Sequence, residues 1–136
     1  MTAPTVAPVT KQLSQEQVNE YADASDDHNP IHVDEAFAAA SPFGGTIAHG
    51  MLVLAAISEM MAASLGEAWL KGGRLKVRFR APAKTADTVT ASAKALTASA
   101  KAQKSADGAV HRYSVECRNQ DGEVLVSGTA QVSAGG

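Results

Sequence analysis

The sequence predicts an α+β fold in which one long buried helix is wrapped by an antiparallel β-sheet. From residue 50 to about residue 70 the side chains are apolar on nearly every side, which is typical of a helix buried on most sides. After the paired glycines at 72 and 73, apolar and polar residues alternate with period two, which indicates half-buried strands. A chain of 136 residues has room for one domain, and we expect a single domain over residues 1–136.

The first half of the chain is predicted to contain a tail, short helices and loops. Its proline- and alanine-rich start is expected to be a flexible tail over residues 1–10. Ser14, followed three residues later by Gln17, forms a capping-box pattern that predicts a helix ending near Ala24. Pro30 disfavours the helical conformation for the residue before it, so the polar stretch that precedes it is predicted to be a loop.

Turn residues and alternation predict the rest of the architecture. Asp34 is the expected cap of a helical turn, which a loop with two glycines follows. Asp107-Gly108 and Asp121-Gly122 are typical hairpin turns. The segment 91–106 is predicted to be a strand pair, although its Ala, Ser and Lys content also allows a helix. The predicted strands lie at about 75–79, 88–93, 113–117 and 124–132.

The composition excludes several classes of function. A net charge of −2 and an aromatic content of 4% predict neither a basic surface nor a stacking platform for nucleic acid. The single cysteine, Cys117, excludes an internal disulfide framework and multi-cysteine metal sites, and it fits the reducing cytoplasm. Polar residues interrupt the apolar run at 51–65, which is shorter than the ~20 residues of a membrane span. We expect neither a membrane segment nor a signal peptide.

The densest group of chemically useful side chains is Asp27-His28-Asn29-Pro30-Ile31-His32. A carboxylate, an amide and an imidazole around a proline turn can be directed at one point, which suits the activation of water. Two other interpretations stay open. In the first, Asp27 and Asn29 bond their own backbone in an Asx turn and His32 is a structural histidine. In the second, His28 and His32 bind a metal with Asp26 or Asp27, although no remote ligand cluster completes the shell.

Gly50 lies where the buried helix is predicted to begin, directly after His49. The first N–H groups of a helix have no intrahelical partner and lie at its positive end, so this position is a candidate oxyanion site. Close packing alone is an alternative reason for the glycine. The sequence contains no GxGxxG, GxxxxGK[ST] or GxSxG motif, which gives no support for a nucleotide cofactor or a serine nucleophile.

Taken together, two segments resemble the signature of the MaoC-like (R)-specific enoyl-CoA hydratases. They are Asp27-His28-Asn29-Pro30-Ile31-His32-Val33-Asp34 and Phe43-Gly44-Gly45-Thr46-Ile47-Ala48-His49-Gly50-Met51-Leu52. The resemblance implies the hot-dog fold and a homodimer or larger homo-oligomer. It also implies reversible hydration of trans-2-enoyl thioesters to (3R)-3-hydroxyacyl thioesters, with coenzyme A or acyl-carrier protein as carrier and without a metal or redox cofactor.

The same resemblance implies roles for individual residues. Asp27 and His32 would be the catalytic pair, Asn29 would position the water, and the Gly50 N–H would be the oxyanion donor. The residues expected to bind substrate or support the site are Ser58, His49 and Arg78. Arg78 belongs to a basic group that is a candidate contact for coenzyme A phosphates, although a solvated strand face explains the same pattern. This group comprises Lys71, Arg74, Lys76, Arg78 and Arg80.

Asp26 stands where the family usually has glycine. Asp tolerates a left-handed backbone better than most residues, and its carboxylate is expected to repel an ionised Asp27. Two alternatives to the hydratase remain. One is a hot-dog thioesterase that uses Glu59 on the buried helix, and the other is a non-catalytic domain that binds acyl thioesters.

Overall fold

The computed structural model describes residues 3–96 and 110–133 and contains one five-stranded antiparallel sheet. The strand order is β1-β3-β4-β5-β2. The helices and strands are β1 (Val9–Gln12), α1 (Gln15–Ser25), α2 (Pro30–Val33), α3 (Glu35–Ala39), α4 (Gly50–Leu65), α5 (Glu67–Gly72), β2 (Arg74–Phe79), β3 (Thr88–Ala95), β4 (Val110–Arg118) and β5 (Val124–Ser133).

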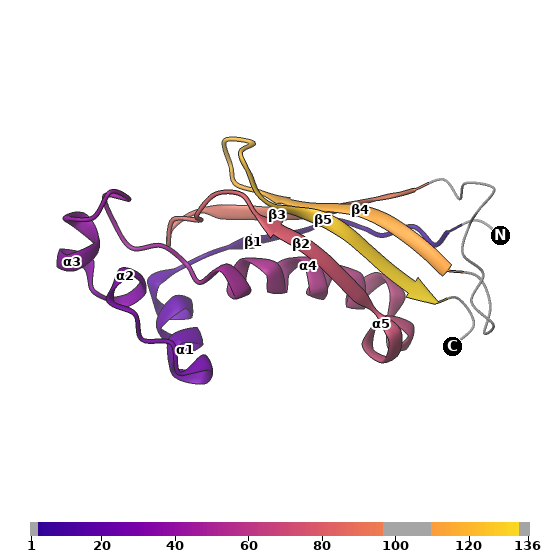
Figure 1. Cartoon of the computed structure of the whole chain (residues 1–136), viewed down its shortest axis with the longest axis horizontal. Coiled ribbons are helices and arrows are strands. Elements are labelled where there is room, and N and C mark those ends of the chain that lie inside the picture. The colour runs from indigo at the N-terminus through magenta and orange to yellow at the C-terminus, as the bar shows by residue number, and fades with distance from the viewer. Residues whose placement is uncertain (1–2, 97–109, 134–136) are drawn as a thin grey trace.

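The long helix α4 lies against one face of the sheet, as the sequence predicts (Figure 1). Figure 1 also shows α1, α2 and α3 beyond one end of the sheet and α5 near the other end. The core lies between the sheet and α4, and the largest fully buried side chains include Ile57, Met60 and Met61 of α4, Tyr113 of β4 and Leu125 of β5. Within residues 3–96 and 110–133, no helix combines the length and the apolar character that crossing a bilayer requires.

The predicted caps of the first helices are confirmed. The Ser14 side chain accepts a hydrogen bond from the Gln17 N–H at 3.1 Å, and α1 follows directly. The Asp34 side chain likewise accepts from the Phe37 N–H at 3.0 Å and caps α3. Local side-chain chemistry therefore fixes where both helices begin.

The long apolar helix ends earlier than predicted. Gly66 has φ 58° and ψ −134°, a backbone conformation that only glycine adopts easily, and it divides the expected helix into α4 and α5. One side of α4 is also open, because the Met51 side chain is 55% exposed. The helix is therefore buried against the sheet with one open side, in agreement with the predicted long buried helix.

The prediction of a flexible tail over residues 1–10 is wrong at its C-terminal end. Val9 and Thr10 belong to β1, which pairs antiparallel with β3. Val6 is buried, and the Tyr113 hydroxyl donates to the Pro4 carbonyl oxygen at 2.7 Å. Pairing of β1 with β3 and burial of Val6 hold this segment against the rest of the domain.

The predicted strands correspond to β2, β3, β4 and β5. The prediction is wrong for the burial of one side chain. Period-two alternation along the predicted strand 75–79 places Phe79 on the same face as Leu75 and Val77, but Phe79 is 55% exposed at the end of the edge strand β2. The turn at Asp121-Gly122 is confirmed, with Gly122 at φ 79°. The turn at Asp107-Gly108 and most of segment 91–106 lie outside the described residues.

Candidate active site

The site begins at the C-terminus of α1, where Asp26 adopts φ 58° and ψ 30°. This left-handed conformation confirms the expectation for the position that the resemblance assigns to glycine. The next N–H, that of Asp27, donates to the Ala22 carbonyl oxygen at 3.1 Å, which completes a Schellman-type helix end. The end of α1 therefore fixes the backbone from which the Asp27 side chain projects.

A second local feature, the start of the short helix α2, positions His32. Pro30 occupies the first turn of α2, and the Asn29 Oδ1 accepts a hydrogen bond from the Ile31 N–H at 3.1 Å. The Asp27 Oδ1 accepts from the Asn29 N–H at 3.3 Å. The Asx-turn interpretation is thus correct for these local bonds. Because Asn29 Oδ1 caps α2, its Nδ2 group is the part that remains for a substrate or water.

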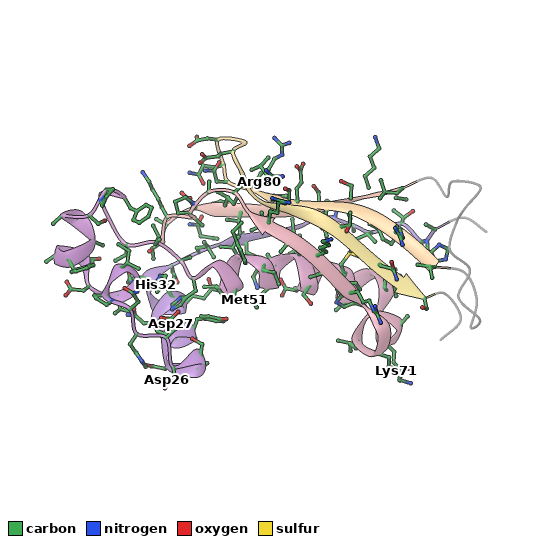
Figure 2. The ribbon with its side chains drawn as sticks, in the orientation of Figure 1. Asp26, Asp27, His32, Met51, Lys71 and Arg80 are labelled. Atoms are coloured by element: carbon green, nitrogen blue, oxygen red, sulfur yellow. The ribbon has the colours of Figure 1, made fainter. Side chains whose placement is uncertain are left out.

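The loop brings Asp27 and His32 together. His32 Nε2 lies 4.0 Å from Asp27 Oδ2, and the side chains are 12% and 52% exposed, respectively. His32 Nδ1 lies 2.8 Å from the Ile47 carbonyl oxygen, so Nδ1 carries the proton that donates this bond. In neutral His32, Nε2 is therefore a hydrogen-bond acceptor that faces the carboxylate. Figure 2 shows Asp27 beside His32 and Asp26 farther from His32.

His49 is the buried member of the group, with only 3% of its surface exposed. Its ring stacks on that of His32, with centroids 3.8 Å apart and planes 24° apart. Its Nε2 lies 3.0 Å from the Asp27 carbonyl oxygen, and the Tyr21 ring packs at 4.8 Å. The family resemblance implied His49 as a supporting residue, but nothing in the sequence analysis assigned Tyr21 to the site.

A cleft of about 320 Å³ opens beside His32 and the start of α4. Gly50 lines it, and no acceptor for the Gly50 N–H occurs among the described residues. A Cβ at this position would lie 3.1 Å from the Phe79 ring. The glycine therefore keeps the first N–H of α4 accessible beside the cleft. The lining residues are His32, Ile47, Ala48, Gly50, Val53, Phe79, Arg80, Ala81, Pro82, Ala83 and Val126.

Three other predicted residues do not join this group. The Ser58 Oγ accepts a hydrogen bond from the indole N–H of Trp69 at 3.2 Å, which connects α4 to α5. Arg78 lies exposed on the edge strand β2 and is not among the cleft residues. Glu59 is ion-paired with Lys11 at 3.1 Å in a separate groove of about 150 Å³.

His28 and Asp26 also point to solvent. The Asp23 carboxylate accepts a hydrogen bond from His28 Nε2 and raises the pKa of exposed His28, and the Asp26 carboxylate lies 3.5 Å from His28 Nδ1. The Asp26 side chain is 96% exposed. These groups form a surface charge cluster outside the cleft, so His28 is not grouped with His32 as a metal-binding interpretation requires.

One set of potential metal ligands does occur, since Asp27, His32 and His49 each offer an atom within 4.8 Å of the others. Imidazole binds a metal through a lone pair in the plane of its ring. The planes of His32 and His49 are stacked and only 24° apart, so they do not intersect near the nitrogens. The stacked arrangement therefore does not suit a metal ion shared by the two imidazoles.

Known proteins are similar to this chain in sequence and in fold. A family model described as the MaoC like domain matches residues 2–116. The 3-hydroxyacyl-thioester dehydratase Z of Mycobacterium tuberculosis is 43% identical over 83 residues, covering 58% of this chain and 55% of the relative. The (R)-specific enoyl-CoA hydratase of Aeromonas caviae is 35% identical over 86 residues, covering 62% of this chain and 63% of that protein. The chain thus spans little more than half the length of the first of these relatives.

Solved structures extend the likeness to almost the whole chain. An (R)-hydratase from A. caviae superposes with a TM-score of 0.80 and 26% identity, covering 98% of this chain and 96% of the other. An R-hydratase from Pseudomonas aeruginosa gives a TM-score of 0.80 and 29% identity, covering 98% and 82%. The chain belongs to the MaoC-like domain family, and its fold is the hot-dog fold that the sequence resemblance implies.

Proposed function

We propose that this protein reversibly adds water across the 2,3-double bond of a trans-2-enoyl thioester and forms the (3R)-3-hydroxyacyl thioester. The observation that carries the proposal is the facing pair of acceptors, Asp27 Oδ2 and His32 Nε2, 4.0 Å apart. Hydrogen bonds of about 2.8 Å from one water molecule span that separation. A water between them would donate one hydrogen to each side chain, and the hydratases named above support this chemistry.

In this mechanism Asp27 is the general base and His32 orients the water. As the water oxygen bonds to C3, Asp27 accepts its proton and the electrons of the double bond move toward C2 and the thioester oxygen. The Gly50 N–H stabilises the charge on that oxygen, a type of contact whose removal costs about 10²–10³-fold in turnover. The proton is then returned from the Asp27–His32 pair to C2, which restores both side chains. Asn29 contributes its free amide Nδ2 to the water.

The acyl group would enter the apolar cleft beside Gly50, with Phe79 and Arg80 at its wall. Ser58 then supports the site indirectly, through the junction of α4 and α5 at Trp69. Arg78 is proposed to contact an anionic carrier, either coenzyme A or acyl-carrier protein, from the exposed face of β2. We further propose a single domain that forms a homodimer and acts in the cytoplasm, where the buried thiol of Cys117 stays reduced.

Incubation with crotonyl-CoA tests the reaction. The absorbance of the conjugated enoyl thioester should fall without release of free thiol, and chiral analysis of the product should show the (3R) alcohol. A matched saturated acyl-CoA should remain unchanged. Release of coenzyme A from the saturated substrate would contradict hydration and favour thioester hydrolysis, whereas binding of crotonyl-CoA without turnover would favour a non-catalytic domain.

A further inference from the structure

The catalytic groups proposed above are anchored to the domain in different ways. His32 is held from outside its own helix, because its ring bonds to the Ile47 carbonyl oxygen and its carbonyl oxygen accepts from Gln15. Within its own loop, Asp27 Oδ1 accepts from the Asn29 N–H, and the Asp27 N–H donates to Ala22 at the end of α1. Its link to the segment that opens α4 is the bond between its carbonyl oxygen and His49 Nε2, at 3.0 Å.

The hydrogen bonding of His49 defines its chemical state. A carbonyl oxygen is an acceptor, so Nε2 must carry the hydrogen of this bond. Nδ1 is buried and has no hydrogen-bond partner among residues 3–96 and 110–133. A second hydrogen at Nδ1 would be a buried donor without an acceptor, which is costly. His49 is therefore the neutral Nε2–H tautomer, opposite to the Nδ1–H tautomer of His32.

His49 also contacts the second catalytic side chain. Its ring stacks on that of His32 with centroids 3.8 Å apart, and the ring of Tyr21 supports it from α1 at 4.8 Å. The same residue is the N-cap of α4, directly before Gly50. One buried side chain thus contacts the backbone of Asp27 and the ring of His32, and it adjoins the proposed oxyanion donor.

We propose that His49 is the positioning residue of this site. Through its Nε2–H bond and its ring stack, it fixes the positions of Asp27 and His32 relative to each other. The proposal rests on the proposed function and adds a role for a residue that does not touch the reacting atoms. Loss of the bond frees the Asp27 loop from α4. The separation from His32 then varies, and a displacement of about 1 Å in a catalytic group costs about 10²-fold in rate.

Two substitutions separate the bond from the stack. His49→Phe retains an aromatic ring against His32 but removes the donor, so kcat for crotonyl-CoA hydration should fall by about 10²-fold with little change in KM. His49→Gln places an amide donor near the position of Nε2 and should recover most of the lost kcat. His111→Phe is the matched control, because His111 is also buried but lies on β4 outside the cleft.

A kcat for His49→Phe near the wild-type value would overturn the proposal, and so would a His49→Gln variant as slow as His49→Phe. Long-range ¹H–¹⁵N spectra of the wild-type imidazoles give a test that needs neither a variant nor turnover. They should show the Nε2–H form for His49 and the Nδ1–H form for His32, and the absence of a hydrogen on Nε2 of His49 overturns the positioning role. Lack of hydration by wild-type protein with the expected tautomers would instead contradict the proposed function.

Discussion

Replacement of Asp27 by Asn should greatly reduce turnover while leaving the free energy of unfolding almost unchanged. The Asp27 side chain is 52% exposed, and its Oδ1 accepts one hydrogen bond, from the Asn29 N–H at 3.3 Å. The amide oxygen of Asn can accept the same bond, so the free energy of unfolding should change by less than about 0.5 kcal/mol. For a chain of 136 residues this corresponds to a Tm shift of about 2 °C or less.

The effect on turnover should be far larger, because Asn cannot accept a proton from water. Loss of a general base costs about 10²–10⁴-fold, and the rate of absorbance loss with crotonyl-CoA measures it. Asp26→Asn is the matched control, since it makes the same chemical change one residue away, at a side chain that is 96% exposed. Asn also tolerates the left-handed backbone at that position.

The losses of activity caused by substituting Asp27 and His32 should not multiply in the double variant. Because Asp27 and His32 act on one water molecule, the double variant Asp27→Asn, His32→Ala should lose little more activity than the slower single variant. A folded Asp27→Asn protein with near wild-type turnover would refute the mechanism. An equally large loss in Asp26→Asn would show that the effect is a general disturbance of the loop.

Three further predictions concern other parts of the chain. At the left-handed position, Asp26→Ala should lower the free energy of unfolding by about 1 kcal/mol while Asp26→Gly should not, as urea unfolding will measure. Burial raises the pKa of the Cys117 thiol to about 11, so the unfolded thiol ionises first as pH rises. Stability should therefore fall between about pH 9 and pH 11 by about 3 kcal/mol, and Cys117→Ala should lack this decrease in urea midpoints. Glu59→Gln should retain crotonyl-CoA hydration, because Glu59 is ion-paired with Lys11 away from the cleft.

Each of these has a clear contrary result. Equal stability of the Ala and Gly variants at position 26 would mean that the left-handed backbone carries no cost. A parallel pH dependence of wild type and Cys117→Ala would show that another group causes the alkaline loss. Abolished turnover in Glu59→Gln would restore the thioesterase alternative.

The features that the sequence predicted correctly arise from short-range chemistry. Ser14 and Asp34 cap helices through bonds to N–H groups three residues away, and such bonds are visible in the order of the residues. The spacing of Asp27 and His32 was equally informative, because Pro30 leaves the intervening loop few conformations. Local rules therefore account for the positions of both members of the proposed catalytic pair.

The features that the sequence could not supply depend on contacts between distant segments. The strand β1 exists because its residues pair with β3, as Val9 does with Ala91. The stack of His49 on His32 and the Ile47 carbonyl that sets the His32 tautomer likewise join separate segments. The expected role of Ser58 gave no hint of its partner Trp69, since the break at Gly66 turns α5 back toward α4.

The bonds at Ile47 have a consequence for how this protein can change over evolution. The Ile47 N–H donates to the Ile31 carbonyl oxygen at 3.2 Å, and the Ile47 carbonyl accepts from His32 at 2.8 Å. These bonds join the two ends of a loop, residues 33–46. The loop contains α3 and lines part of a second cleft of about 460 Å³. Because doubling the length of a closed loop costs only about 0.6 kcal/mol, insertions and deletions there are thermodynamically inexpensive. The wall of that second cleft can therefore diversify in length and sequence while the proposed catalytic pair keeps its geometry.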